Sequence, residues 1–136
     1  MASPTMKKLS PVLIVRDIEP CLGFWAALGF ERAAEVPHGD RLGFVLLAKD
    51  GVELMYQSRA SVQQDVPALA ELPSSSYLYL EVDDLDAVVP KLAGAPVIVA
   101  RRKTFYGADE LGVREPGGNV VLFSQHGSQQ GSSQGS

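Results

Sequence analysis

Two short stretches with one pattern, IVRDIE at residues 14–19 and EVDDLD at residues 81–86, decide the fold. In each stretch an apolar strand is followed by an aspartate, Asp17 or Asp84, and then by a helix. The carboxylate of this aspartate can cap the helix by accepting hydrogen bonds from its first free N–H groups. Asp17 and Asp84 lie 67 positions apart, and the turn glycines Gly51 and Gly118 also lie 67 positions apart. Two coincidences at one offset indicate an internal duplication.

The residues around each aspartate predict the order strand, helix, strand, strand, strand. In the first half we expect a helix over 18–28, which Gly29 ends, and a turn at 37–40. The strands of this half are expected at residues 11–15, 30–36, 41–48 and 52–57. The second half has a helix from residue 85 that Gly94 ends, and strands at 77–82, 96–100, 108–114 and 119–125.

The sequence of 136 residues fits one α+β domain. We expect two βαβββ modules, about 8–57 and 76–126, that form curved mixed sheets with the helices on the outer face. Residues 58–75 are expected to be a linker with one helical turn near 68–72. Residues 1–7 are expected to be flexible and the polar residues 127–136 disordered.

The composition of the chain limits the classes of binding partner that we expect. The net charge of −4 opposes nucleic-acid binding. Because the sequence contains neither a signal-like segment nor an apolar run long enough to span a bilayer, we expect no membrane association. The single cysteine, Cys21, cannot form an internal disulfide, which fits a reducing compartment and makes the cytoplasm the expected location.

Strand alternation divides the side chains between two faces. We expect one face to pack on the helices, with Leu13, Val15, Leu54, Tyr56, Leu78, Leu80, Val121 and Phe123. The open face would carry Ser10, Val12, Ile14, Glu53, Met55, Gln57, Tyr77, Tyr79, Glu81, Val120, Leu122 and Ser124. Trp25 and Cys21 lie on the apolar stripe of the first helix, so both are expected in the core.

Three segments resemble the vicinal oxygen chelate superfamily, which contains glyoxalases, dioxygenases and bleomycin-resistance proteins. They are PVLIVRDIEPCLGFWAALGF (11–30), YLYLEVDDLDAVVPKL (77–92) and TFYGADELGVREPGGNVVLF (104–123). The resemblance covers about 8–126 and is closest to bleomycin-resistance-like members. It supports the two-module fold, but it does not fix a reaction, because one fold hosts many chemistries.

Metal-using members of that superfamily hold a divalent ion at positions that fall here on Ser10, Glu53, Tyr77 and Leu122. Of these residues, only Glu53 is a conventional ligand, whereas a divalent site needs several converging N or O donors. The two histidines, His38 in a turn and His126 at the start of the tail, lie away from the expected pocket. We therefore expect neither a metal nor another cofactor.

The resemblance and the strand alternation together place a ligand pocket on the open face. The expected ligand-binding residues are Glu53, Met55, Tyr77, Tyr79, Phe105, Tyr106 and Leu122. The two tyrosines at 77 and 79 could instead be packing residues, and Glu53 could be paired with an arginine. If Glu53 were buried and unpaired, its raised pKa would suit a general base. Residues 101–103 (RRK) are expected to be a solvated face.

The leading hypothesis is a metal-free protein that binds an aromatic or cationic, drug-like molecule and acts by sequestration, as in antibiotic resistance. The resemblance implies a homodimer with the ligand at the seam between chains. The alternative is a glyoxalase- or dioxygenase-like lyase or isomerase that uses Glu53, with a divalent metal or as a bare base. A third possibility is a partner-binding module whose pocket is filled by side chains.

Overall fold

A computed structural model describes residues 4–5, 7–71 and 76–127 of the chain. The first module contains β1 (Val12–Val15), α1 (Glu19–Ala27), β2 (Glu31–His38), β3 (Arg41–Lys49) and β4 (Val52–Ser58). The connection contains α2 (Arg59–Asp65) and α3 (Pro67–Ala70). The second module contains β5 (Leu78–Glu81), α4 (Leu85–Val88), the 3₁₀ helix η1 (Val89–Leu92), β6 (Val97–Lys103), β7 (Ala108–Arg114) and β8 (Val120–His126).

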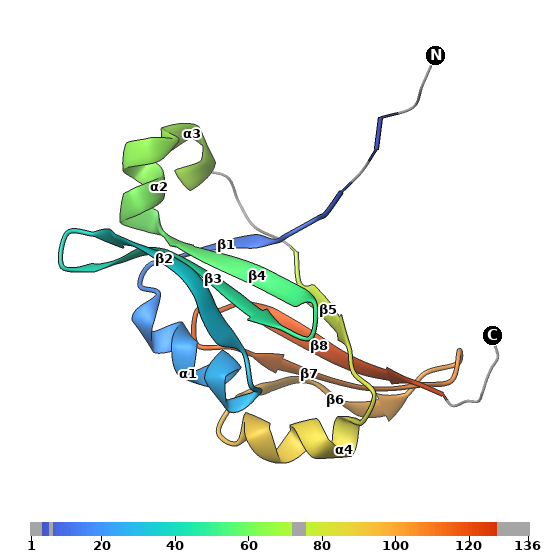
Figure 1. The fold of residues 1–136 in the computed structure, drawn as a ribbon. Helices are drawn as coiled ribbons and strands as arrows, with labels where there is room; N and C mark the ends of the chain where they lie inside the picture. Colours follow the sequence, from blue (N-terminus) through green and yellow to red (C-terminus); the bar gives the residue numbers. More distant parts are fainter. Residues whose placement is uncertain (1–3, 6, 72–75, 128–136) are drawn as a thin grey trace.

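The strands form two four-stranded mixed sheets, in the orders β1-β4-β3-β2 and β5-β8-β7-β6 (Figure 1). In each sheet the first strand runs parallel to the last, and the remaining pairs are antiparallel. Val12 pairs with Met55, and the residues 67 positions later, Tyr79 and Leu122, also pair. The predicted α+β fold of two βαβββ modules is therefore confirmed, and this pairing follows the same 67-residue offset.

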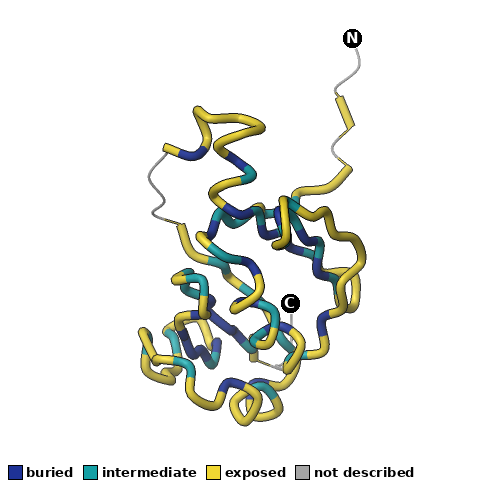
Figure 2. The backbone as a smooth tube through the Cα atoms, turned by 90° about the vertical axis from the view of Figure 1, so that its left-hand side faces the viewer, coloured by how far each residue is buried: buried dark blue, intermediate teal, exposed yellow. Residues whose placement is uncertain are grey.

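One apolar core joins both modules, and α1 lies between the two sheets (Figure 1). Trp25 of α1 is 1% exposed and belongs to the same cluster as Tyr56 of the first sheet and Phe123 of the second. The face predicted to pack on the helices is confirmed, since its members are buried or packed against this core. Buried segments run through the middle strands of each sheet, whereas β2 is exposed along almost its whole length (Figure 2).

A buried hydrogen bond inside this core connects the modules. The buried Tyr56 hydroxyl accepts a hydrogen bond from Trp25 Nε1 and donates one to the buried carboxylate of Glu115, which follows β7. The turn after Glu115 approaches the first module so closely that a Cβ on Gly117 would lie 2.7 Å from Val15 Cγ1. The hydrogen bonds and the close packing thus fix one module on the other.

The connection between the modules departs from the prediction. Residues 59–70 form the helices α2 and α3 instead of a linker with one helical turn. Ser58 begins α2 as an N-cap, with its side chain accepting from Ser61 N at 3.2 Å. The end of the expected linker, residues 72–75, lies outside the described residues, as do most of the expected tail and residues 1–3 and 6.

Both predicted aspartate caps also need correction. The first helix starts one residue later than expected, with Ile18 at the N-cap, while Asp17 forms ion pairs with Arg16 and Arg41. Asp84 occupies the N-cap position of α4, but its side chain makes no capping bond, and Gln125 Oε1 accepts from Leu85 N instead. Tertiary partners thus replace the local capping interactions.

The first hairpin turn is shorter than predicted, because Pro37 and His38 belong to β2. A proline is tolerated there because β2 is an edge strand. No helix among the described residues is long and apolar enough to cross a membrane.

Candidate functional site

The open face of the second sheet is hollowed into a cavity of about 600 Å³. Leu122 on β8 and Val99 on β6 contribute apolar surface to it, and Tyr77 lies at its edge. The other lining residues are Ser76, Ile98, Arg102, Arg114, Gly117, Gly118, Asn119 and Val120. Two of the predicted ligand-binding residues, Tyr77 and Leu122, therefore line a cavity of a size that suits a small organic molecule.

A buried carboxylate, Glu110 on β7, organises the polar side chains beside this cavity. It is 0% exposed and accepts hydrogen bonds from Tyr106 at 2.7 Å, Arg102 at 3.0 Å and Ser124 at 3.1 Å. Burial alone would raise the pKa of Glu110, but these hydrogen bonds and the guanidinium charge outweigh it and lower that pKa. The hydrogen bond from Tyr106 also raises the pKa of the Tyr106 phenol. The network therefore holds an ionised glutamate and a neutral tyrosine at neutral pH.

Tyr79 and His126 extend the network along the open face. The Tyr79 hydroxyl donates to Ser124 Oγ at 2.9 Å and lies 2.7 Å from His126 Nε2. His126 was expected to lie away from the pocket, but it is the last residue of β8 and shares the parity of Leu122 and Ser124. His126 does not line the cavity, as expected, but the strand runs one residue further than predicted, which keeps this imidazole on the open face.

An exposed aromatic rim stands next to the network, in the loop between β6 and β7. The Phe105 side chain is fully exposed, and its ring packs edge-on against Tyr106 with centroids 5.0 Å apart. Tyr106 lies in turn 6.3 Å from the ring of His126. Neither ring lines the cavity, but aromatic side chains that stand in solvent offer a stacking surface for a flat ligand.

The two predicted residues of the first module, Glu53 and Met55, lie on β4 in the other sheet and do not line this cavity. Glu53 accepts a hydrogen bond from Ser10 at 2.7 Å and pairs with Lys8 at 3.1 Å, so its partner is a lysine and not an arginine. These two partners lower the pKa of Glu53. Because a general base in this role needs a raised pKa, the geometry argues against that use of Glu53.

The superfamily's divalent-metal site does not fit the residues present. At the four equivalent positions, Ser10 donates its hydroxyl to Glu53, Tyr77 is 59% exposed, and Leu122 offers no donor atom. Within residues 4–5, 7–71 and 76–127, no group of three or more His, Cys, Asp or Glu side chains is placed to hold a metal ion. No catalytic step through a metal follows from this donor set.

Sequence reasoning missed Glu110, Arg102 and Arg114. Residues 101–103 are exposed, as expected, but Arg101 pairs with Asp86 and Asp109, and Arg102 pairs with Glu110. The strand 108–114 was predicted correctly, and its alternation would have placed residues 110 and 114 on one face. A carboxylate and an arginine on the same face of a predicted strand were the available signal.

Comparison with solved structures shows the same fold in proteins of low sequence identity. A glyoxalase-related enzyme from Fulvimarina pelagi is 19% identical, with a TM-score of 0.72 over 97% of this chain and 96% of that chain. TnmS3, an antibiotic binding protein from Streptomyces sp. CB03234, is 23% identical, with a TM-score of 0.67 over 92% and 99%. The bleomycin resistance determinant of transposon Tn5 is 19% identical, with a TM-score of 0.63 over 90% and 99%.

A search of the curated proteins found no match. A family model, in contrast, matches residues 8–123, which include all eight strands except the end of β8. The chain therefore belongs to the glyoxalase/bleomycin resistance protein/dioxygenase superfamily.

Proposed function

We propose that this protein binds aromatic small molecules on its open face without a metal ion and acts by sequestering them. The observation that carries the proposal is the cavity of about 600 Å³ with apolar surface from Leu122, Ile98 and Val99. The exposed rim of Phe105 and Tyr106 stands in the same module. The family's metal positions lack a matching donor set, so binding relies on the side chains alone.

The affinity would come mainly from buried apolar and aromatic surface, since covering such surface contributes roughly 25 cal/mol per Å². Polar residues would orient the ligand, since Tyr77, Arg102 and Arg114 also line the cavity. Two open-face carboxylates, Glu53 and Glu110, are already paired with Lys8 and Arg102. A cationic group on the ligand would compete for them, so we place the aromatic body first among its features.

We also propose that a second copy of the chain completes the site. The helix-side faces of both sheets are covered within one chain by the shared core, whereas the open faces carry the exposed Tyr77, Tyr79 and Ile98. Pairing the first module of one chain with the second module of another would bring Glu53 and Met55 opposite this cavity. We expect such a pair of chains to form in the cytoplasm.

Two of the structural relatives support the class of ligand. TnmS3 is an antibiotic binding protein, and the transposon Tn5 protein is a bleomycin resistance determinant. Both cover at least 90% of this chain with the same fold, which makes an aromatic antibiotic a reasonable first ligand to try.

A thermal-shift screen of metal-stripped protein against planar aromatic antibiotics and dyes, with proflavine as the fluorescent representative, tests the proposal. We expect some members to raise the melting temperature, and Leu122→Arg and Tyr106→Ala to abolish that rise. Val52→Ala, on β4 and outside the cavity, is the control and should leave the rise intact. The proposal fails if no member stabilises the protein, or if stabilisation requires added Mn²⁺ or Ni²⁺.

A further inference from the structure

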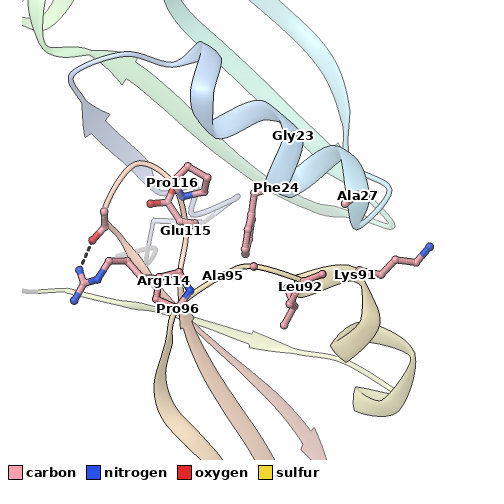
Figure 3. A pocket seen from close by; sticks show the side chains of 13 residues that line it. Gly23, Phe24, Ala27, Lys91, Leu92, Ala95, Pro96, Arg114, Glu115 and Pro116 are labelled. Atoms are coloured by element: carbon pink, nitrogen blue, oxygen red, sulfur yellow. Dashed lines mark hydrogen bonds between the residues drawn. The ribbon is translucent and has the colours of Figure 1, made fainter.

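A second cavity, of about 610 Å³, opens on the helix side of the molecule, at the seam between the two modules (Figure 3). One wall is α1, and the other is the segment that joins η1 to β6. The Phe24 ring points from α1 toward Leu92 and Ala95 across the gap (Figure 3). Pro96 and Pro116 add further apolar surface. The walls of this cavity are thus mainly apolar, and they include neither ring of the aromatic rim.

The two ends of the cavity carry positive charge that no carboxylate of the described residues pairs. All 12 lysines and arginines lie in the described residues, and eight of them form ion pairs with carboxylates. Of the four that have no such partner there, Lys91 and Arg114 line this cavity. Figure 3 shows Arg114 at one end and Lys91 at the other, with Phe24 between them.

The local carboxylate forms no ion pair with either cation. Glu115 lines the cavity, but its side chain is 1% exposed and accepts hydrogen bonds from Tyr56 and Asn119. Arg114 donates to Gly118 O at 2.7 Å, which leaves further N–H groups of its guanidinium for another acceptor. Two cations and one carboxylate give the cavity lining a net charge of +1, which suits an anion.

Space is kept open beside Phe24 by a glycine in the middle of α1. A Cβ on Gly23 would meet nothing within 4 Å, so no contact inside the described chain requires glycine here. Glycine in a helix interior costs roughly 0.5–1 kcal/mol relative to alanine. The position therefore gives up helix stability while leaving room in the cavity wall for an occupant.

From the cavity, its charges and this open wall, we propose that the seam binds an anionic amphiphile, a carboxylate or sulfonate on an aliphatic or aromatic body. The apolar body lies against Phe24 and Leu92. Arg114 holds the acid group, because its planar fork matches a carboxylate. Lys91 strengthens the positive field from the other end. This site is separate from the open-face cavity, with which it shares only Arg114 and Gly118.

Calorimetric and NMR titrations with decanoate and with uncharged decanamide test the proposal. Decanoate should bind at least tenfold more tightly than decanamide, with amide shifts centred on α1 and the β7–β8 turn. Gly23→Leu and Ala27→Leu, which fill the cavity from one wall, should each weaken decanoate at least tenfold. Leucine is a strong helix former, so Ala27→Leu tests the site without a risk to the helix.

Charge variants separate this site from the open face. Arg114→Gln should remove most of the preference for decanoate over decanamide. Arg59→Gln, at another arginine without a carboxylate partner in the described chain, should leave decanoate binding within twofold, as should Ile98→Glu in the open-face cavity. Equal affinity for the two probes would overturn the proposal. So would loss of binding in Ile98→Glu with retention in Ala27→Leu, and neither result depends on whether aromatic ligands bind the open face.

Discussion

Tyr56 joins the two halves of the duplicated chain through one hydroxyl group. It accepts from Trp25 and donates to Glu115, and all three side chains are at most 1% exposed. Burial and the adjacent Glu115 carboxylate raise the pKa of this phenol, so it stays a hydrogen-bond donor throughout the physiological range. A buried carboxylate is tolerated in the core because this donor and Asn119 satisfy it.

Replacing Tyr56 with phenylalanine should therefore destabilise the protein by about 1–3 kcal/mol, because Glu115 loses a donor while it stays buried. Urea unfolding at pH 7 measures the change. Tyr77→Phe is the matched control: Tyr77 is 59% exposed, and its substitution should stay within about 0.5 kcal/mol. A Tyr56→Phe variant as stable as the control would contradict the role given to this hydroxyl.

The lowered pKa of Glu110 predicts how the stability of the fold depends on pH. Because its folded-state pKa lies below the unfolded value of about 4.3, Glu110 stabilises the fold above that pH. This contribution is lost as the pH falls through the folded-state pKa. Arg102→Gln removes the partner charge, so it should raise the pKa of Glu110 and flatten the acid limb of the stability curve.

Carboxyl ¹³C NMR titration measures that pKa directly. Lys103→Gln is the control, since Lys103 pairs with Asp109 and not with Glu110. It should leave the pKa of Glu110 unchanged. A wild-type value at or above about 4.3, the unfolded reference, or no response to Arg102→Gln, would show that the network does not hold this carboxylate as described.

Two glycines, one inside the first helix and one after it, should respond to alanine substitution in opposite ways. Gly23 lies inside α1, and a Cβ added there would meet nothing within 4 Å, so Gly23→Ala should stabilise the protein by roughly 0.5–1 kcal/mol. Gly29 has φ +94° and would place a Cβ 3.1 Å from the Lys49 side chain, so Gly29→Ala should destabilise it by about 1–2 kcal/mol. Relative to the wild-type protein, the midpoints of thermal and urea unfolding should rise for Gly23→Ala and fall for Gly29→Ala.

The strands were predictable from the sequence because their alternation is set by local geometry and burial. The strand 108–114 was predicted with the bounds observed, and the helix-side face was predicted correctly. The helix caps were not, because tertiary partners decide them: Arg41 pairs with Asp17, and Gln125 replaces Asp84 as the acceptor for Leu85 N, although the second helix starts at Leu85 as predicted.

The candidate site was predictable only in part. Of its seven predicted residues, Tyr77 and Leu122 line the open-face cavity, and Tyr79 and Tyr106 belong to the network around Glu110 and Ser124. Glu53 and Met55 were placed on the correct face of a strand, but that strand belongs to the other sheet. The network around Glu110 was missed because it depends on register between β6, β7 and β8, which pattern alone does not give.

Because the two modules share one core, the whole molecule should unfold as one unit. Trp25 lies in the first module but belongs to the core cluster that contains residues of both sheets. Urea unfolding followed by Trp25 fluorescence and by the amide NMR signals of β7 and β8 should therefore give coincident midpoints. Two separated midpoints would mean that the modules are held together far more weakly than the shared core implies.

We expect paired chains to bind an aromatic ligand on the open faces of their sheets without a metal ion. Native mass spectrometry of purified protein, with metal analysis of the same sample and proflavine added, tests that claim most directly. We expect a two-chain species without stoichiometric metal that retains proflavine after treatment with EDTA. A species that carries about one divalent ion per cavity, and that loses proflavine when the ion is removed, would contradict it.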